Sequence, residues 1–215
     1  MSKLCLAQFI ISSIEVRYET GFFDEIVEDF GSGAPMNRLV QGDVGSGKTM
    51  IAAAAGFLAV QNGKQAALMA PTEILAEQHF FTLGKLLEPL GVRLCLLTGS
   101  MKTKEKRLFR EAIAAGQIHV VIGTHALLSE ATEFQNLDMV IADEQHRFGV
   151  AQRAALSQKG KDPHILVMSA TPIPRTLALI MYGDLDVSIL DELPPGRQPV
   201  DQPRDQFMIT HVISV

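Results

Sequence analysis

A glycine-rich octapeptide, GDVGSGKT at residues 42–49, constrains the fold more than any other stretch of the chain. It matches the pattern G-x-x-x-x-G-K-[ST], which binds phosphate groups through backbone amides. Residues 38–41 can form a short strand before it, and residues 50–60 are rich in good helix formers. The octapeptide is therefore expected at a strand-to-helix turn, where its amides and the helix N-terminus attract an anion. A glycine-rich turn that binds nothing is the alternative.

The side chains of this octapeptide have expected roles in binding ATP. The ammonium group of Lys48 is expected to contact the β- and γ-phosphates and to stabilise the phosphoryl group as it transfers, and the Thr49 hydroxyl is placed to bind Mg²⁺. Glycines permit the tight turn that the loop requires. The expected nucleotide-binding residues are Gly42, Asp43, Val44, Gly45, Ser46, Gly47, Lys48 and Thr49.

Two adjacent carboxylates, Asp143 and Glu144, follow an apolar strand expected at residues 138–142. At the carboxyl edge of a parallel sheet such acids lie beside a phosphate site. Asp143 is expected to hold Mg²⁺ directly or through water, and Glu144 to orient and deprotonate the water that attacks the γ-phosphate. In the alternative interpretation the two acids only cap the next helix.

Composition limits the class of protein. At 215 residues the chain can bury one substantial core, so one nucleotide-binding domain is expected. It has no run of 18 or more apolar residues, which predicts no membrane partner. Cys5 and Cys95 lie outside any C-x-x-C pattern, so neither a disulfide framework nor a zinc site is indicated, and a cytoplasmic location fits best. The apolar residues 1–14 lack a clear cleavage site, which disfavours a signal peptide.

Strands and helices alternate along the chain at the spacing of a parallel α/β sheet. The periodicity predicts an α/β fold in which helices flank a mostly parallel sheet. A helix at residues 21–30 is expected to pack on the edge of the domain. Further helices are expected at 73–87 and 102–115, and further strands at 65–70, 92–97, 119–122 and 164–168.

Several loops begin where expected strands end, and their hydroxyl groups and helix N-termini could hold phosphates of a nucleic acid. One such loop contains Thr72 and another contains Gly123 and Thr124. A third, with Ser169 and Thr171, could hydrogen-bond the acidic loop and report the nucleotide state to a bound polymer. Each of these signals is weak by itself. Short hydroxyl residues before a proline, as Thr171 is before Pro172, usually form a turn.

The expected helix at 102–115 carries five basic side chains. They could contact a DNA backbone, or they could form a solvated helix face. The net charge of −5 opposes long-range attraction of DNA, so any DNA contact must be local or assisted by other parts. The basic residues are Lys102, Lys104, Lys106, Arg107 and Arg110.

Taken in order, GDVGSGKT, APTEILAEQH, GTHALL, DEQHRFGVAQR and SATPIPRTLAL resemble the first motor domain of superfamily 2 DNA helicases, specifically the RecG family. The transcription-repair coupling translocases are similar here but usually have Glu where this chain has Gln145. The resemblance implies a RecA-like P-loop NTPase fold and ATP-driven remodelling of branched DNA. It implies that Thr72, Gly123 and Thr124 face the DNA backbone. Gln145, His146, Ser169 and Thr171 would couple the two sites.

The resemblance also implies an organisation in which this chain is half of a motor. Residues 1–35 are expected to be an atypical, partly helical leader, residues 36–192 the ATP-binding motor domain, and residues 193–215 a linker-like tail. Family members carry a second motor domain and an amino-terminal wedge domain as partners, and neither fits in this length. They also read adenine with a Gln before the P-loop, whereas Glu19 lies near that position here.

Three functions compete at this point. The first is an ATP-dependent DNA helicase motor, an enzyme that hydrolyses ATP while it translocates on DNA. The second is a nucleotide- or DNA-binding module without turnover, because half a motor lacks the arginine that a second domain supplies. The third, a small-molecule P-loop kinase, lacks recognisable acceptor-binding and lid segments. DNA-stimulated ATP turnover distinguishes the first function from the second.

Overall fold

The computed structural model of the protein describes residues 20–43, 45–143, 155–170 and 186–190. Its helices are α2 (Thr20–Gly31), α3 (Lys48–Gln61), α4 (Glu73–Leu87) and α5 (Thr103–Ala114), with short 3₁₀ helices η1 (Glu88–Leu90) and η2 (His125–Leu128). Its strands are β1 (Asn37–Gly42), β2 (Gln65–Met69), β3 (Leu94–Leu97), β4 (Val120–Gly123), β5 (Leu137–Ala142), β6 (His164–Ser169) and β7 (Asp186–Leu190).

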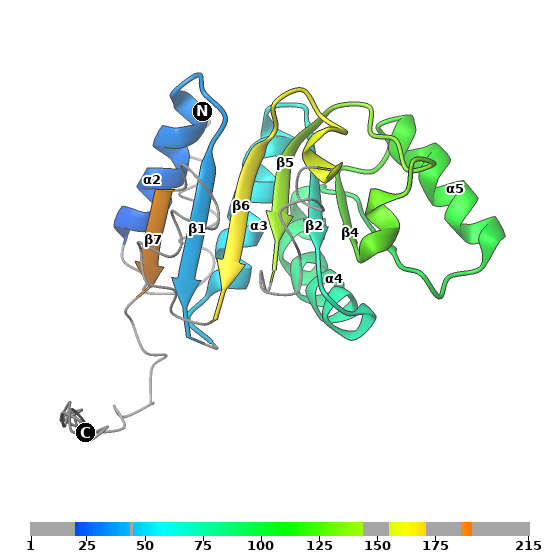
Figure 1. Ribbon diagram of the computed structural model, residues 1–215, viewed down its shortest axis with the longest axis horizontal. Coiled ribbons are helices and arrows are strands. Elements are labelled where there is room, and N and C mark those ends of the chain that lie inside the picture. Colours follow the sequence, from blue (N-terminus) through cyan, green and yellow to red (C-terminus); the bar gives the residue numbers. More distant parts are fainter. Residues whose placement is uncertain (1–19, 44, 144–154, 171–185, 191–215) are drawn as a thin grey trace, which may run out of the picture.

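The seven described strands form one sheet in the order β3-β4-β2-β5-β6-β1-β7, and each neighbouring pair is parallel (Figure 1). This confirms the expected α/β fold, with a parallel sheet flanked by helices. The expected helix at 73–87 has the same bounds as α4, and the other expected elements within the described residues differ by a few residues at their ends. Strand β7 was not expected, because its sequence DVSIL is short and alternates polar and apolar residues over only four positions.

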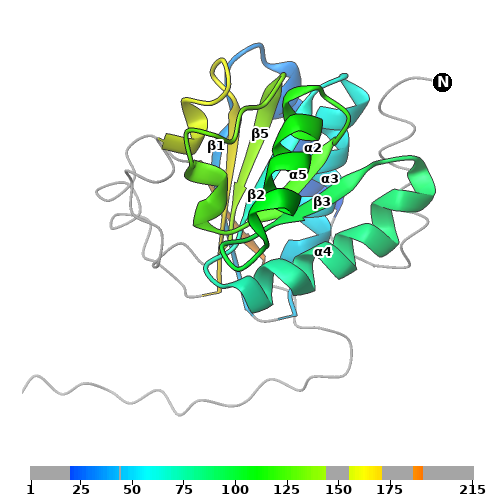
Figure 2. The same ribbon diagram turned by 90° about the vertical axis from the view of Figure 1, so that its right-hand side faces the viewer.

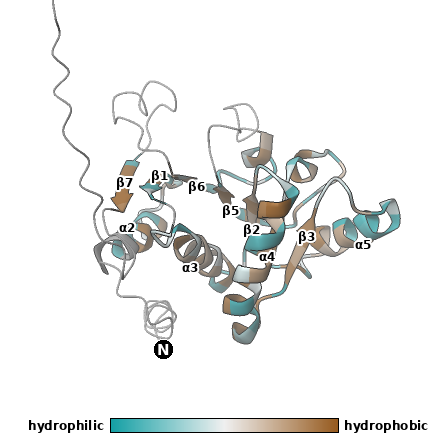
Figure 3. Ribbon diagram, turned by 90° about the horizontal axis from the view of Figure 1, so that it is seen from below, coloured by the Kyte–Doolittle hydropathy of each residue, from teal (hydrophilic) through white to brown (hydrophobic). Residues whose placement is uncertain are grey.

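Both faces of the sheet are covered, as parallel sheets require. Alternate residues of β2 divide between two apolar clusters: Ala66 and Leu68 pack with α3 and α4, whereas Ala67 and Met69 pack with Ile113 of α5. Seen from below the sheet, α2, α3 and α4 lie along one side of the strands (Figure 3). In the side view, α4 crosses below β3 and α5 lies in front of the sheet (Figure 2). The two clusters together fix the strands that carry the candidate site.

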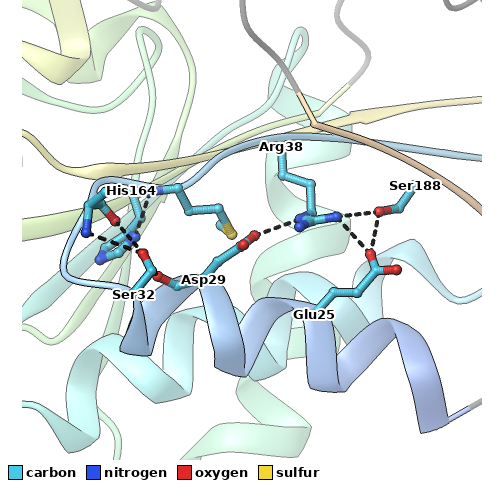
Figure 4. A network of polar contacts seen from close by, with 8 residues as sticks. Glu25, Asp29, Ser32, Arg38, His164 and Ser188 are labelled. Carbon is cyan, nitrogen blue, oxygen red and sulfur yellow. Dashed lines mark hydrogen bonds and ion pairs between the residues drawn. The ribbon is translucent and has the colours of Figure 1, made fainter.

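A buried arginine joins the leader helix to the edge of the sheet. Arg38 of β1 contacts the carboxylates of Glu25 and Asp29 on α2 at 2.7 Å each, and it donates to the Ser188 hydroxyl of β7 at 2.7 Å (Figure 4). Burial lowers the pKa of Arg38, but the hydrogen bond and charge of Asp29 outweigh it, so the net pKa is raised. Ile26 of α2 is fully buried in the larger apolar cluster. Helix α2 thus packs at the edge of the sheet, as expected.

The substitution Arg38→Met is expected to lower the free energy of unfolding by about 2–3 kcal/mol. It keeps the length of the side chain but leaves the Asp29 carboxylate without its charged partner, and hydrogen bonds to charged groups contribute about 1.5–3 kcal/mol. The measurement is urea unfolding of the purified chain. Arg107→Met is the control, because Arg107 forms an exposed ion pair with Glu111 at 3.6 Å. This substitution should lower the free energy of unfolding by less than about 1 kcal/mol. Equal effects of the two substitutions would contradict this account of α2.

Among the described residues, no helix is long and apolar enough to cross a membrane. Cys95 is a free, buried thiol on β3, and burial raises its pKa to about 12. It therefore stays protonated near neutral pH and acts as a small apolar residue of the core. Cys5 lies outside the described residues.

Candidate nucleotide-binding site

The register of the sheet brings the sequence motifs to one edge. Gln41 of β1 lies opposite Ser169 of β6, and Met69 of β2 lies opposite Ala142 of β5 on one side and Gly123 of β4 on the other. Because all these strands are parallel, the segments that follow them leave the sheet at the same carboxyl edge. The glycine-rich loop, Asp143 and the loops after β2, β4 and β6 therefore begin beside one another.

The glycine-rich loop connects β1 directly to α3. Gly45 and Gly47 have φ angles of 87° and 91°, which side chains rarely adopt, and Gly47 precedes the first residue of α3. The Ser46 amide donates to the Asp43 carbonyl at 3.1 Å and closes the turn. The first amides of an α-helix have no acceptor within the helix, so this arrangement suits a phosphate. Val44 lies outside the described residues.

Lys48 is the first residue of α3, and its ammonium group lies over the loop. Its Nζ donates to the carbonyl oxygens of Gly42 at 2.6 Å and Asp43 at 2.7 Å, and to the Ser46 hydroxyl at 3.4 Å. The charge is thus held among oxygen atoms at the mouth of the turn. Thr49 follows in the same helical turn and is half-buried.

Gly42 has a packing role that its motif does not reveal. A Cβ atom at this position would lie 2.4 Å from the Ser46 hydroxyl oxygen and 2.9 Å from the Cβ of Leu190 on β7. Real Cβ contacts are not this short, so the first turn of the loop and the end of β7 pack together only because residue 42 lacks a side chain. The loop is therefore supported by the unexpected strand.

Asp143 follows β5 and is buried, with 9% of its surface exposed. Its amide donates to the Met69 carbonyl at 3.0 Å, and its Oδ2 lies 2.5 Å from Nε2 of His79 on α4. His79 ends the APTEILAEQH motif, but the sequence predicts no role for it, because its separation of 64 residues from Asp143 conceals the contact. The other candidates of the acidic motif, Glu144, Gln145 and His146, lie outside the described residues.

Ser169 is the last residue of β6 and is fully buried. Strand β6 lies between β1, which leads into the glycine-rich loop, and β5, which leads into Asp143. Ser169 is thus on the strand that separates the two nucleotide motifs. Thr171 lies outside the described residues, so its expected role stays a prediction. Glu19, which stands near the position of the adenine-reading Gln in the family, also lies outside them.

The expected DNA contacts lie in loops after β2 and β4. Thr72 caps α4, because its hydroxyl accepts from the Leu75 amide at 3.3 Å. A hydroxyl that accepts in this way can still donate its own hydrogen to a phosphate. Next to it, Glu73 accepts from the Ser100 amide at 2.9 Å, and hydrogen bonds from Ser100 lower the pKa of Glu73. Thr124 is 2% exposed, and its hydroxyl oxygen finds no hydrogen-bond partner in the described part of the chain.

Gly123 is buried at the end of β4, and the neighbouring strand explains the glycine. A Cβ atom there would lie 2.2 Å from the Leu97 carbonyl oxygen of β3 and 3.2 Å from Cδ2 of Leu127. The backbone oxygen cannot move away without separating β3 from β4. Gly123 therefore has a structural requirement beside its predicted contact with DNA.

Gly123→Ala is accordingly expected to lower the free energy of unfolding by about 1–3 kcal/mol, the usual cost of overpacking a core. Gly56→Ala is the matched control. It lies within α3, where a Cβ atom would meet only the Ala66 Cβ at 3.8 Å, and alanine is the better helix former by about 1 kcal/mol. Thermal unfolding should shift in opposite directions for the two variants. A neutral Gly123→Ala variant would show that β3 and β4 tolerate separation.

The basic residues around α5 are partly engaged with the protein itself. Lys106 contacts the Gly99 carbonyl, Arg107 pairs with Glu111, and Arg110 donates to the Thr132 hydroxyl at 3.2 Å. Lys102 and Lys104 are exposed at the start of the helix. These contacts favour the interpretation of a mainly structural and solvated helix face, on which Lys102, Lys104 and Arg107 are exposed to solvent.

Comparison with known proteins places the chain among helicases. Residues 24–180 match the family described as DEAD/DEAH box helicase. The chain is 57% identical over 178 residues to the ATP-dependent DNA helicase RecG of Aquifex aeolicus, which covers 82% of this chain and 22% of that protein. It is 55% identical over 180 residues to the RecG of Escherichia coli K12, covering 82% and 26% of the two chains. The chain thus spans about a quarter or less of these relatives.

Solved structures agree with the fold. A structure of RecG bound to a three-way DNA junction has a TM-score of 0.80 and 45% identity, covering 93% of this chain and 27% of the other. The DUF1998 helicase MrfA has a TM-score of 0.65 and 18% identity over 85% of this chain, covering 32% of its own, which shows a shared fold alone.

Proposed function

The chain belongs to the DEAD/DEAH box helicase family, and on this premise we propose that it is the ATP-binding half of the motor of a RecG-like ATP-dependent DNA helicase. In the intact protein this motor hydrolyses ATP and translocates on DNA to remodel replication forks and recombination intermediates. The observation that carries the proposal is the common edge of β1, β6 and β5, from which the glycine-rich loop, Ser169 and Asp143 leave the sheet side by side.

In this proposal, residues 42–49 bind ATP. The backbone amides and the N-terminus of α3 surround the β- and γ-phosphates, and Lys48 exchanges its loop carbonyl partners for phosphate oxygens. Glu144 accepts a proton from the water that attacks the γ-phosphate. Lys48 also stabilises the charge that develops on the transferred phosphoryl group.

The donor set at this edge also fits Mg²⁺. The hydroxyl of Thr49 and the carboxylate of Asp143 are oxygen ligands, which Mg²⁺ prefers, and Mg²⁺ keeps several waters and phosphate oxygens as its other ligands. We propose these two residues as its protein ligands. When bound, Mg²⁺ neutralises charge on the β- and γ-phosphates. Asp143 is held in place by the Met69 carbonyl and by His79.

DNA is the proposed second ligand of this edge. Thr72, at the start of α4, can donate to a backbone phosphate, and Gly123 and Thr124 are proposed to present backbone groups there, since the Thr124 side chain is buried. One solved structure that this chain resembles is RecG bound to a three-way DNA junction, so a branched DNA is the proposed substrate. Ser169 and Thr171, with Gln145 and His146, are proposed to couple DNA contact to the acidic motif.

The proposal includes partners outside this chain. A second motor domain would supply an arginine to the γ-phosphate, and a wedge domain would bind the branch of the DNA. The proposed location of the whole protein is the cytoplasm. Where such arginines have been measured they raise the rate by about 10³–10⁵. The chain alone is therefore expected to bind ATP but to hydrolyse it poorly, and to bind DNA weakly.

The test is ATP hydrolysis by what we call the intact polypeptide, in which this chain is joined to the second motor and wedge domains of a RecG helicase. A three-way DNA junction should stimulate turnover more than a linear duplex of equal length does. The chain by itself is the comparison for the contribution of the added domains. ATP binding without stimulation by either DNA would favour the passive nucleotide-binding module instead.

A further inference from the structure

His79 on α4 and Asp143 after β5 form a buried contact. Helix α4 begins after Thr72, a predicted DNA contact, and Asp143 is the predicted metal ligand. His79 is 8% exposed and Asp143 is 9% exposed, and Nε2 of the ring lies 2.5 Å from Oδ2 of the carboxylate. A carboxylate that holds a metal ion is ionised and only accepts hydrogen bonds, so in the metal-binding state the ring donates from Nε2. The backbone of Asp143 is held separately, by the bond from its amide to Met69. Asp143 is thus held through its backbone by the sheet and through its carboxylate by α4.

Helix α4 is held firmly enough to act as a support. Ala76, Leu83 and Leu87 are fully buried in the larger apolar cluster, and Thr72 caps its first turn. His79 is seven residues beyond the cap, about 10 Å along the helix axis at 1.5 Å per residue. Any shift of the helix as a body therefore moves both the Thr72 end and the hydrogen bond to Asp143.

We infer that His79 is a positioning residue, which orients the Asp143 carboxylate toward the metal ion of the nucleotide and ties that orientation to the DNA-contacting start of α4. The inference rests on the proposed function, since it assumes that Asp143 serves the metal. Groups that hydrogen-bond a metal-ligating carboxylate typically affect metal affinity or activity by about 10–100-fold. Because α4 begins at Thr72, DNA bound there would act on the same carboxylate through His79.

The first test measures nucleotide affinity by calorimetry, with Mg²⁺ and with a chelator, in the intact polypeptide defined above. Wild type should bind ATP more tightly with Mg²⁺. His79→Leu removes the ring hydrogen bond and should reduce this Mg²⁺-dependent gain by about 10-fold or more, while affinity in the chelator stays the same. His79→Gln should restore most of the gain, because its amide Nε2 can donate from a similar reach.

Matched variants separate positioning from folding. Gln78→Ala, an exposed change on the same helix, should leave the gain intact. Thermal unfolding identifies any variant that does not fold; should His79→Leu fail, His79→Asn, whose amide is too short to reach Asp143, replaces it. A full Mg²⁺-dependent gain in ATP affinity in His79→Leu would overturn the inference. Equal losses of that gain in His79→Leu and His79→Gln would also overturn it.

A second readout addresses the link to DNA. The Mg²⁺ concentration that half-saturates ATP hydrolysis should fall when the junction is added to wild type, and this shift should disappear in His79→Leu. A shift that persists would overturn the link through α4. Failure of wild type to bind ATP at all would instead reject the proposed function, so the two failures are distinguishable.

Discussion

Lys48→Ala is expected to weaken ATP binding by about 10–100-fold and to lower turnover in the intact polypeptide by a further factor of about 10²–10³. The binding loss follows because the ammonium group is the cation held at the mouth of the loop, where it contacts the Gly42 and Asp43 carbonyls. A charged hydrogen bond contributes about 1.5–3 kcal/mol, which is the range of the expected affinity change. The turnover loss follows because no other side chain of the loop carries a positive charge against the developing phosphoryl charge.

The fold should tolerate this substitution. Alanine is a good helix former at the start of α3, and the lost hydrogen bonds go to loop carbonyls rather than to the core. The free energy of unfolding should therefore change by about 1 kcal/mol or less. Calorimetry measures the affinity, and urea unfolding measures the stability. Lys85→Ala, an exposed lysine at the end of α4, controls for the loss of charge alone. Unaltered ATP affinity in a folded Lys48→Ala variant would remove Lys48 from the nucleotide site.

Glu144→Gln is expected to separate binding from chemistry. The amide keeps the shape of the side chain and can still hydrogen-bond water, but it cannot accept the proton of the attacking water. General-base catalysis contributes about 10²–10⁴ in rate, so turnover should fall by that factor while ATP affinity stays within about twofold. Multiple-turnover hydrolysis in the intact polypeptide measures the first quantity, and calorimetry measures the second.

An exposed acid provides the control for this substitution. Glu130→Gln removes the same charge from the loop after η2 and should leave turnover unchanged. If both variants hydrolyse ATP at the rate of wild type, Glu144 is not the base. If both are slow, net charge rather than proton transfer controls the rate.

The sequence by itself determined the architecture and the chemistry that the chain can carry. Apolar runs separated by helical segments predicted a parallel α/β sheet, because a strand buried on both faces needs apolar residues at consecutive positions. The P-loop could be recognised in the sequence because its backbone conformation requires glycines at fixed spacing. Its contacts with phosphate and metal also require one lysine and one hydroxyl at fixed positions. Helix α4 was predicted with the right bounds, and its start follows directly after Pro71 and Thr72, of which Thr72 caps it in the structure.

Tertiary structure alone decided which of these residues meet. His79 and Asp143 are 64 positions apart, and no spacing rule predicts their hydrogen bond, because it depends on how α4 packs beneath the sheet. The same holds for Arg38, whose partners come from α2 and β7. Gly42 and Gly123 looked like functional glycines in sequence, yet each is also required by a neighbouring strand within van der Waals reach. Such requirements arise from contacts distant in sequence, so only the folded chain can reveal them.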